Sequence, residues 1–197
     1  MQSISKERDK SISNVTNEMR VLQNNREQAN CGGGFVWRID KWREKMEQAR
    51  ANINRYIDSE SFYSHTNGYK MRLRVYPNGD GCGYGTHLSV WCCVMRGECD
   101  DILPWPFKHD VTFELIDRHA TRIHTSSTVK YGDQYKDENG YYVTYYWRDI
   151  RKPQSINNSN WICCNYKFVS LKELSSDNDR SLIDNDQIFI RCRVNIQ

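Results

Sequence analysis

From residue 34 onward, short segments with the alternation of a β-strand follow one another, separated by turn residues rather than by long helices. Residues 69–76 alternate polar and apolar side chains, and residues 88–95 are almost wholly apolar, which suits the interior of a sandwich. Alternation with period two directs side chains to opposite faces of a strand. The pattern predicts an all-β fold, an antiparallel β-sandwich. Further strands are expected over residues 35–39, 111–116, 141–147, 161–168 and 188–194.

One short helix is expected after the first strand. Trp42, Met46 and Ala49 recur at helical spacing, and Asp40 precedes them. Asp is a preferred N-cap residue because its carboxylate accepts hydrogen bonds from backbone N–H groups that the first helical turn leaves unpaired. We therefore expect Asp40 to cap this helix.

The first 31 residues differ in composition from the rest, since they contain no Pro, no Gly and no aromatic residue. Four apolar side chains recur at the a/d spacing of a coiled coil: Ile12, Val15, Met19 and Leu22. A polar helix with one narrow seam is marginal alone, so it is expected to self-associate. The alternative is a disordered or cloning-derived leader. Because three glycines follow, two parts are expected, a coiled-coil helix over 1–31 and a sandwich domain over 32–197.

Charge and hydropathy argue against two classes of partner. The chain has 28 Lys and Arg against 25 Asp and Glu, a formal net charge of +3, and opposite charges are interleaved. A nucleic-acid backbone reader would usually show a basic excess or block, so no nucleic-acid partner is expected. The longest apolar run, residues 90–95, is far short of the roughly 20 residues of a spanning helix, so no membrane insertion is expected.

The eight cysteines are interpreted as reduced thiols of a cytoplasmic protein rather than as a disulfide framework. Cys92-Cys93 and Cys163-Cys164 are adjacent pairs, and neighbours on a strand point to opposite faces, so one member of each pair is expected in the core. No C-x-x-C pair and no His-Glu-x-x-His arrangement occurs, and we predict no metal site. A Cys–His nucleophilic pair could assemble in space, but no motif nominates one. We therefore predict no catalytic residue and no cofactor.

Residues 68–107 carry several multi-residue blocks in a fixed order. They are Gly68-Tyr69-Lys70, the turn Asn78-Gly79-Asp80-Gly81, then Gly85-Thr86-His87-Leu88-Ser89, and Trp105-Pro106-Phe107. This order closely resembles the C-terminal domain of the tumour necrosis factor receptor-associated factors, the TRAF family, within the wider meprin-and-TRAF-homology (MATH) group. The resemblance extends over residues 34–197. It implies an eight-stranded antiparallel sandwich preceded by a coiled coil that forms a homotrimer.

The resemblance also implies a groove that binds an extended peptide by adding it as a strand to a sheet edge. Arg74 and Tyr76 match the positions where the family contacts an acidic peptide residue. Asp80 and Gly81 match its turn contacts, and Trp91 matches a groove aromatic. From the residues alone, Arg74 and Tyr76 could equally lie on an ordinary solvated sheet face, and Trp91 in the core. Both Arg74 and Tyr76 are expected to be exposed at the rim.

One stretch departs from the family pattern. Many members place consecutive serines, which grip a peptide Gln, just before a Phe-x-x-Pro stretch. Here the corresponding stretch is Ile150-Arg151-Lys152-Pro153, and it follows Trp147-Arg148-Asp149. The added basic charge would suit an acidic peptide rather than a Gln-centred motif. Tyr141 is a further candidate for a groove aromatic.

The resemblance implies a cytosolic signalling adaptor that binds short motifs in receptor cytoplasmic tails or in adaptor proteins. Family members usually carry a RING and zinc fingers; this chain supplies no ligands for them, so any ubiquitin-ligase activity is expected to lie outside it. Two alternatives stay open. One is a substrate-recognition MATH domain of a ubiquitin ligase, which would lack the trimeric helix. The other is an extracellular lectin-like sandwich, which would require paired cysteines.

Overall fold

The computed structural model describes residues 34–117, 122–136, 142–144, 150–155, 160–175 and 182–196. Tyr141 and the residues of the predicted coiled-coil seam (Ile12, Val15, Met19 and Leu22) lie outside the described residues. The coiled coil therefore stays a prediction.

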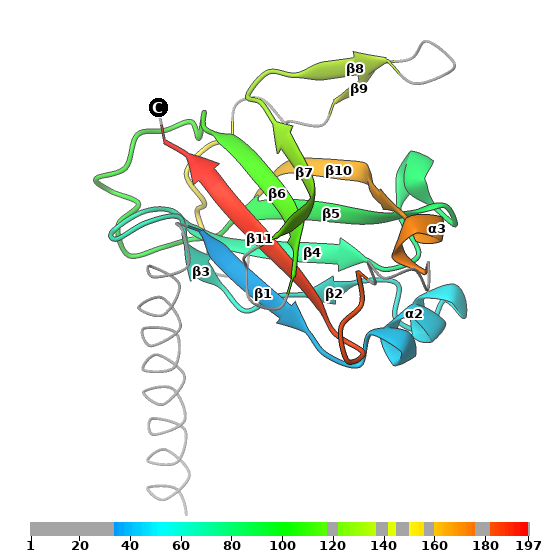
Figure 1. The fold of residues 1–197 in the computed structure, drawn as a ribbon. Helices are drawn as coiled ribbons and strands as arrows, with labels where there is room; N and C mark the ends of the chain where they lie inside the picture. The colour runs from blue at the N-terminus through cyan, green and yellow to red at the C-terminus, as the bar shows by residue number, and fades with distance from the viewer. Residues whose placement is uncertain are drawn as a thin grey trace, which may run out of the picture.

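Two antiparallel sheets form the body of the domain (Figure 1). The first sheet has the order β1-β11-β6-β7 and is built from β1 (Phe35–Ile39), β11 (Ile188–Asn195), β6 (Asp110–Ile116) and β7 (Ile123–Val129). The second sheet has the order β10-β5-β4-β2 and is built from β10 (Asn160–Ser170), β5 (His87–Val94), β4 (Lys70–Tyr76) and β2 (Ile57–Asp58).

Two further pairings lie off these paths. β3 (Phe62–Tyr63) also pairs with β4, and β8 (Gln134–Lys136) pairs with β9 (Tyr142–Thr144) in a separate ribbon. In Figure 1 the strands of the first sheet cross in front of those of the second. The expected antiparallel β-sandwich is thus confirmed, with four strands along each of the two main paths.

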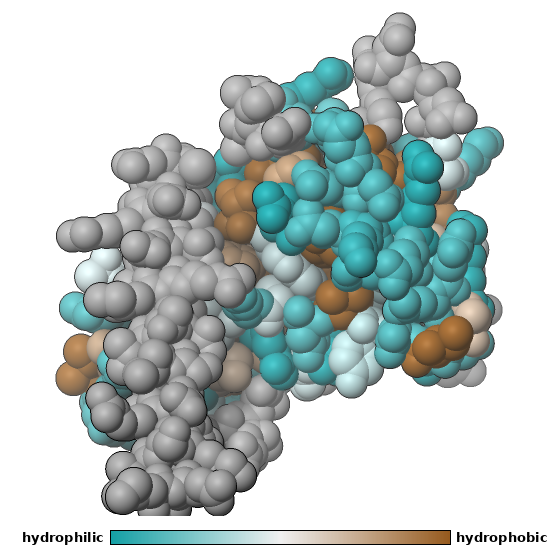
Figure 2. Space-filling view, turned by 90° about the horizontal axis from the view of Figure 1, so that it is seen from below, coloured by the Kyte–Doolittle hydropathy of each residue, from teal (hydrophilic) through white to brown (hydrophobic). Residues whose placement is uncertain are grey.

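The core lies between the two sheets and follows the period-two alternation of the sequence. Met71, Leu73 and Val75 of β4 are fully buried, while the residues between them are only partly covered. On the first sheet, Phe113 and Leu115 of β6 are buried in the same cluster. Figure 2 shows the molecule from below, where the surface is mostly hydrophilic and hydrophobic side chains form separate patches. The outer face of β4 is therefore the part of this strand that is available to a ligand.

The adjacent cysteines behave partly as expected. Cys92 and Cys163 lie opposite each other on β5 and β10 and belong to the core cluster, which also contains Cys192 of β11. Cys93 and Cys164, their neighbours in sequence, are buried too, on the other face of the second sheet. Burial raises the pKa of the Cys163 thiol and raises that of Cys164 to about 12. These thiols are therefore protonated, buried groups of low reactivity.

The helix α2 (Trp42–Arg50) confirms the helical spacing, but the predicted cap was wrong. Lys41 precedes the helix in a left-handed conformation, with φ 55°. The first N–H groups of the helix instead bond to Asp186, near the other end of the chain. The Trp42 N–H donates to the Asp186 carbonyl oxygen and the Arg43 N–H to its carboxylate, each at 2.9 Å. The Asp40 carboxylate pairs with Arg38 at 3.1 Å.

The remaining helices are short. They are the 3-10 turn η1 (Gly81–Gly83) and α3 (Leu171–Leu174), which begins with a capping box between Ser170 and Glu173. None of the helices within the described parts of the chain is long and apolar enough to span a membrane.

A candidate peptide-binding face

The outer face of the second sheet collects most of the residues that the sequence nominated. Arg74 and Tyr76 are two residues apart on β4, so both point away from the core. Arg74 lies directly opposite Trp91 of β5, and Trp91 lies opposite Cys164 of β10. Trp91 is partly buried on this outer face, so the alternative of a core aromatic was wrong. Three neighbouring strands thus contribute to one surface.

Arg74 was expected to be exposed at the rim, but in the structure its side chain is bound by other residues of the chain. Its Nε and Nη2 donate to the two carboxylate oxygens of Asp58 at 2.6 and 2.8 Å, because β2 pairs with β4 and places Asp58 opposite Arg74. The side chain is only 17% exposed. The hydrogen bonds with Asp58 raise the pKa of Arg74 further above its usual range, against the opposing effect of burial.

Two aromatic rings lie against this guanidinium. The Arg74 Cζ lies 3.6 Å from the ring centre of Tyr56 and 4.7 Å from that of Trp161, at the start of β10. Cation–π contacts at such distances stabilise the arginine where it is. Together with the ion pair, the two rings fix the guanidinium in one position and one orientation.

The aromatic contacts continue across the face. Trp91 packs edge-on against Trp161 and Tyr166, with ring centres 5.6 and 5.7 Å apart, and against Tyr76 at 5.9 Å. Burial raises the pKa of the Tyr76 hydroxyl and outweighs the opposing effect of the nearby Arg74. We call these residues the aromatic face: Tyr56, Tyr76, Trp91, Trp161 and Tyr166.

The turn that carries Asp80 and Gly81 docks onto the same surface. Gly81 has a φ of 50°, and a Cβ at this position would lie 2.7 Å from the ring of Tyr166. The Asp80 N–H donates to Ser89 Oγ at 2.9 Å, and the Ser89 hydroxyl donates to the Tyr166 carbonyl oxygen at 2.6 Å. Glycine is therefore required at 81 both for its backbone conformation and for the close approach of Tyr166.

The charges on this face nearly cancel. Asp58 also pairs with Arg72, whose Nη1 lies 3.6 Å from Asp58 Oδ2, and the Asp80 carboxylate lies 3.6 Å from Arg55. Three arginines therefore face two aspartates, which leaves an excess of one positive charge. The charge of Arg74, which was predicted to contact an acidic peptide residue, is thus largely neutralised by residues of the same chain.

One edge of the second sheet lies beside the aromatic face. β10 ends the strand order, and within the described residues only β5 pairs with it along Asn160–Asn165. Its register shifts between Trp161 and Cys163. Further along, the Asn165 side chain donates to Ser127 of β7 at 2.8 Å, which links the two sheets at that point. The segment around Trp161 therefore combines a sheet edge with an aromatic side chain of the site.

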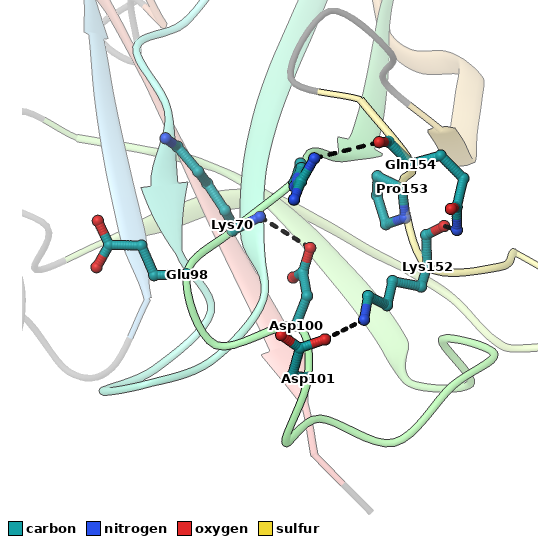
Figure 3. Close-up of a pocket in the computed structure, with 9 residues that line it drawn as sticks. Lys70, Glu98, Asp100, Asp101, Lys152, Pro153 and Gln154 are labelled. Carbon is teal, nitrogen blue, oxygen red and sulfur yellow. Dashed lines mark hydrogen bonds and ion pairs between the residues drawn. The ribbon is translucent and has the colours of Figure 1, made fainter.

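The stretch 150–153 lies beside the start of β10, where the Asn160 side chain donates to the Arg151 carbonyl oxygen at 2.8 Å. Ile150 packs into the core, and Lys152 pairs with Asp101, so the charge of Lys152 is already compensated (Figure 3). Lys152 and Pro153 line a polar pocket of about 520 Å³, which is also lined by Lys70, Arg96, Glu98, Asp100 and Asp101. The basic charge of Lys152 is thus not free to bind an acidic peptide at the aromatic face.

Sequence reasoning missed four residues of the site, namely Tyr56, Asp58, Trp161 and Tyr166. Trp161 and Tyr166 lie in a predicted strand, but they are five residues apart, so period-two alternation alone would place them on opposite faces. The register shift between Trp161 and Cys163 has no signal in that alternation. Asp58 gave no such signal, because its strand has only two residues. Within the described residues, no cluster of three or more His, Cys, Asp or Glu side chains is arranged to hold a metal ion.

The fold and this surface define a class of protein. A family model for the MATH domain matches residues 34–194, and the chain belongs to this family. Within it, the resemblance to the TRAF family is confirmed. Mouse TNF receptor-associated factor 1 is 30% identical over 188 residues, which cover 95% of this chain and 41% of that protein. Human TNF receptor-associated factor 2 is 43% identical over 102 residues, 52% of this chain and 20% of that protein.

A solved structure agrees with the fold. The structure of Notothenia coriiceps TRAF5 superposes on this chain with a TM-score of 0.69 and 24% sequence identity. The match covers 100% of this chain and 90% of the TRAF5 chain. This chain spans less than half the length of the curated relatives it matches.

Proposed function

We propose that this domain belongs to a cytosolic signalling adaptor and binds short peptide motifs of receptor cytoplasmic tails or adaptor proteins by β-strand addition. The observation that carries the proposal is the edge of β10 beside the aromatic face. In strand addition, main-chain hydrogen bonds supply affinity and alternate side chains of the peptide enter pockets on one face. A peptide paired with β10 would direct alternate side chains toward Trp161 and its neighbours.

The proposed role is binding, without catalysis or a cofactor. Large aromatic side chains such as Trp91 and Trp161 dominate the energetics of binding surfaces. The turn at Asp80 and Gly81 closes one end of the surface, and Tyr76 adds a hydroxyl group to it. The five nominated residues, Arg74, Tyr76, Asp80, Gly81 and Trp91, would thus share one ligand.

Self-association completes the proposal. The predicted seam of Ile12, Val15, Met19 and Leu22 would join three copies into a homotrimer, in keeping with the family resemblance. A single exposed edge gives modest affinity, whereas linked sites that meet clustered tails gain about 10²–10⁴ in apparent affinity. The mechanism proposed here is therefore avidity.

An N-methyl scan of a bound peptide tests strand addition. A peptide selected against the full chain from a random library would be methylated at one backbone nitrogen at a time. Strand addition predicts large losses of affinity at every second position, because only alternate N–H groups face the paired strand. Trp161→Ala should abolish binding, while Ile123→Ala, an exposed side chain on the opposite sheet, should bind like the parent. Equal tolerance at all positions would refute strand addition.

A further inference from the structure

We propose that Asp58 is an internal carboxylate that occupies the arginine site of the aromatic face and makes it select against acidic peptide residues there. The inference rests on the proposed function, because it concerns the specificity of the same surface. The ligand expected on this surface is a peptide segment with a neutral aromatic or aliphatic residue facing Arg74.

Asp58 is held in place from both sides of its backbone. It lies opposite Arg74 in the β2–β4 pairing, and the next residue, Ser59, is buried. The Ser59 N–H donates to the Leu73 carbonyl oxygen at 2.9 Å, and the Leu73 N–H donates to Ser59 Oγ at 3.0 Å. A loop carboxylate without these bonds could move aside, whereas Asp58 is fixed beside β4.

Asp58 occupies one of the two pairs of parallel N–H donors that the Arg74 guanidinium offers to a carboxylate, and its charge neutralises that of the arginine. Bidentate pairing requires two parallel N–H groups of one guanidinium, and Nε and Nη2 of Arg74 are both engaged. The rings of Tyr56 and Trp161 also lie against this guanidinium. Arg72, the other arginine on this face of β4, pairs with the same aspartate. One carboxylate therefore serves both arginines.

An incoming acidic side chain would have to displace a competitor that is part of the same chain. A tethered group acts at an effective concentration that a free ligand seldom reaches. Displacement would also leave Asp58 next to a second carboxylate, and this arrangement is unfavourable because like charges at short range repel. A neutral side chain avoids both costs and can pack on Trp161 and Trp91. Asp58 is thus a specificity-determining residue.

The test compares the parent with Asp58→Asn, which removes the charge and keeps the shape. Both full chains would select from a displayed library of random twelve-residue peptides, and affinities would then be measured for matched peptides that differ only as Glu or Gln at one position. The parent should bind the Gln peptide more tightly than the Glu peptide. Asp58→Asn should enrich Asp and Glu at one position and bind the Glu peptide at least tenfold more tightly. Asp58→Ser, which also removes the charge, should behave like Asp58→Asn.

The matched control is Asp101→Asn, which breaks an exposed ion pair with Lys152 and should leave the Glu-to-Gln ratio at the parent value. A parent that already prefers Glu tenfold, with the ratio unchanged in Asp58→Asn, would overturn the role of Asp58. Failure of all variants to select any peptide would overturn the proposed function as well. The NMR signal of the Arg74 Nε–H in the free chain separates the two failures. It should exchange slowly in the parent and rapidly in Asp58→Asn, and unaltered exchange would refute the pairing itself.

Discussion

The two sheets carry the same ionic unit in different surroundings. On the first sheet, Glu114 of β6 accepts hydrogen bonds from Arg191 and Arg193 of β11; on the second, Asp58 lies between Arg74 and Arg72. The Glu114 side chain is 1% exposed, whereas that of Asp58 is 26% exposed. The first unit is inaccessible to a ligand and the second is not. Burial, rather than the residues themselves, decides which unit is structural and which can take part in binding.

Glu114→Gln should have the largest effect. Arg191 is 7% exposed and would lose its only hydrogen-bonded carboxylate within the described residues, so a buried charge would remain unpaired. Removing one partner of a buried ion pair costs about 3–5 kcal/mol of stability. Denaturant unfolding followed by tryptophan fluorescence measures this cost.

A double variant separates the loss of the pair from the loss of Glu114. Glu114→Leu with Arg191→Met replaces both partners by apolar groups of similar size and should cost far less than Glu114→Gln. A cost below about 1 kcal/mol for Glu114→Gln, a value expected of an exposed pair, would remove the proposed difference between the two sheets.

Arg74→Ala should destabilise the fold by about 1–3 kcal/mol, because two charge-assisted hydrogen bonds with Asp58 are lost. An arginine exposed at the rim, as first expected, would leave stability unchanged. The partly open position of Asp58 keeps the cost below that of Glu114→Gln. Thermal unfolding of the parent, Arg74→Ala and Arg74→Lys gives the order, with the lysine variant in between because an ammonium group cannot replace the planar fork. Unfolding midpoints that coincide would restore the exposed-rim interpretation.

Some features of the two sheets could be predicted from the sequence and others could not. Alternation in residues 69–76 and 188–194 predicted β4 and β11, because local periodicity specifies which face of a strand is buried. β7, with the sequence Ile-His-Thr-Ser-Ser-Thr-Val, was missed because an edge strand of polar residues has no apolar alternation.

Contacts between distant segments account for the remaining errors. The cap of α2 comes from Asp186, 143 residues after Arg43, and the partner of Arg74 comes from a two-residue strand. Family resemblance nominated five residues that the fold brings onto or beside one face, yet it could not indicate that Asp58 already occupies the arginine. No local pattern encodes such a pairing, since it depends on the register between β2 and β4.

Tyr76→Phe probes a smaller contribution to the unit on the second sheet. The phenol hydroxyl lies on the aromatic face, and the loss of one hydrogen bond from it to the peptide should cost about 0.5–1.5 kcal/mol of affinity. The ring contacts with Trp91 and Tyr56 should persist, so the melting temperature should change little. Calorimetric titration with a selected peptide measures the affinity. A loss as large as that of Trp161→Ala would mean that the hydroxyl, rather than the ring, is the main contact.

Salt should affect the two units differently, and this is the smallest effect. Raising the ionic strength from 0.1 to 1 M shortens the Debye length from about 10 to about 3 Å, which screens solvent-accessible charges far more than buried ones. The coupling between Asp58 and Arg74, measured by a double-mutant cycle with Asp58→Asn and Arg74→Gln, should therefore fall by about a few tenths of a kcal/mol. The coupling between Glu114 and Arg191, measured with Glu114→Gln and Arg191→Gln, should stay constant, because water and ions do not reach side chains that are 1% and 7% exposed. Equal salt sensitivity in both cycles would show that the two carboxylates have the same access to solvent, and the Asp58 unit would then have no advantage as a ligand site.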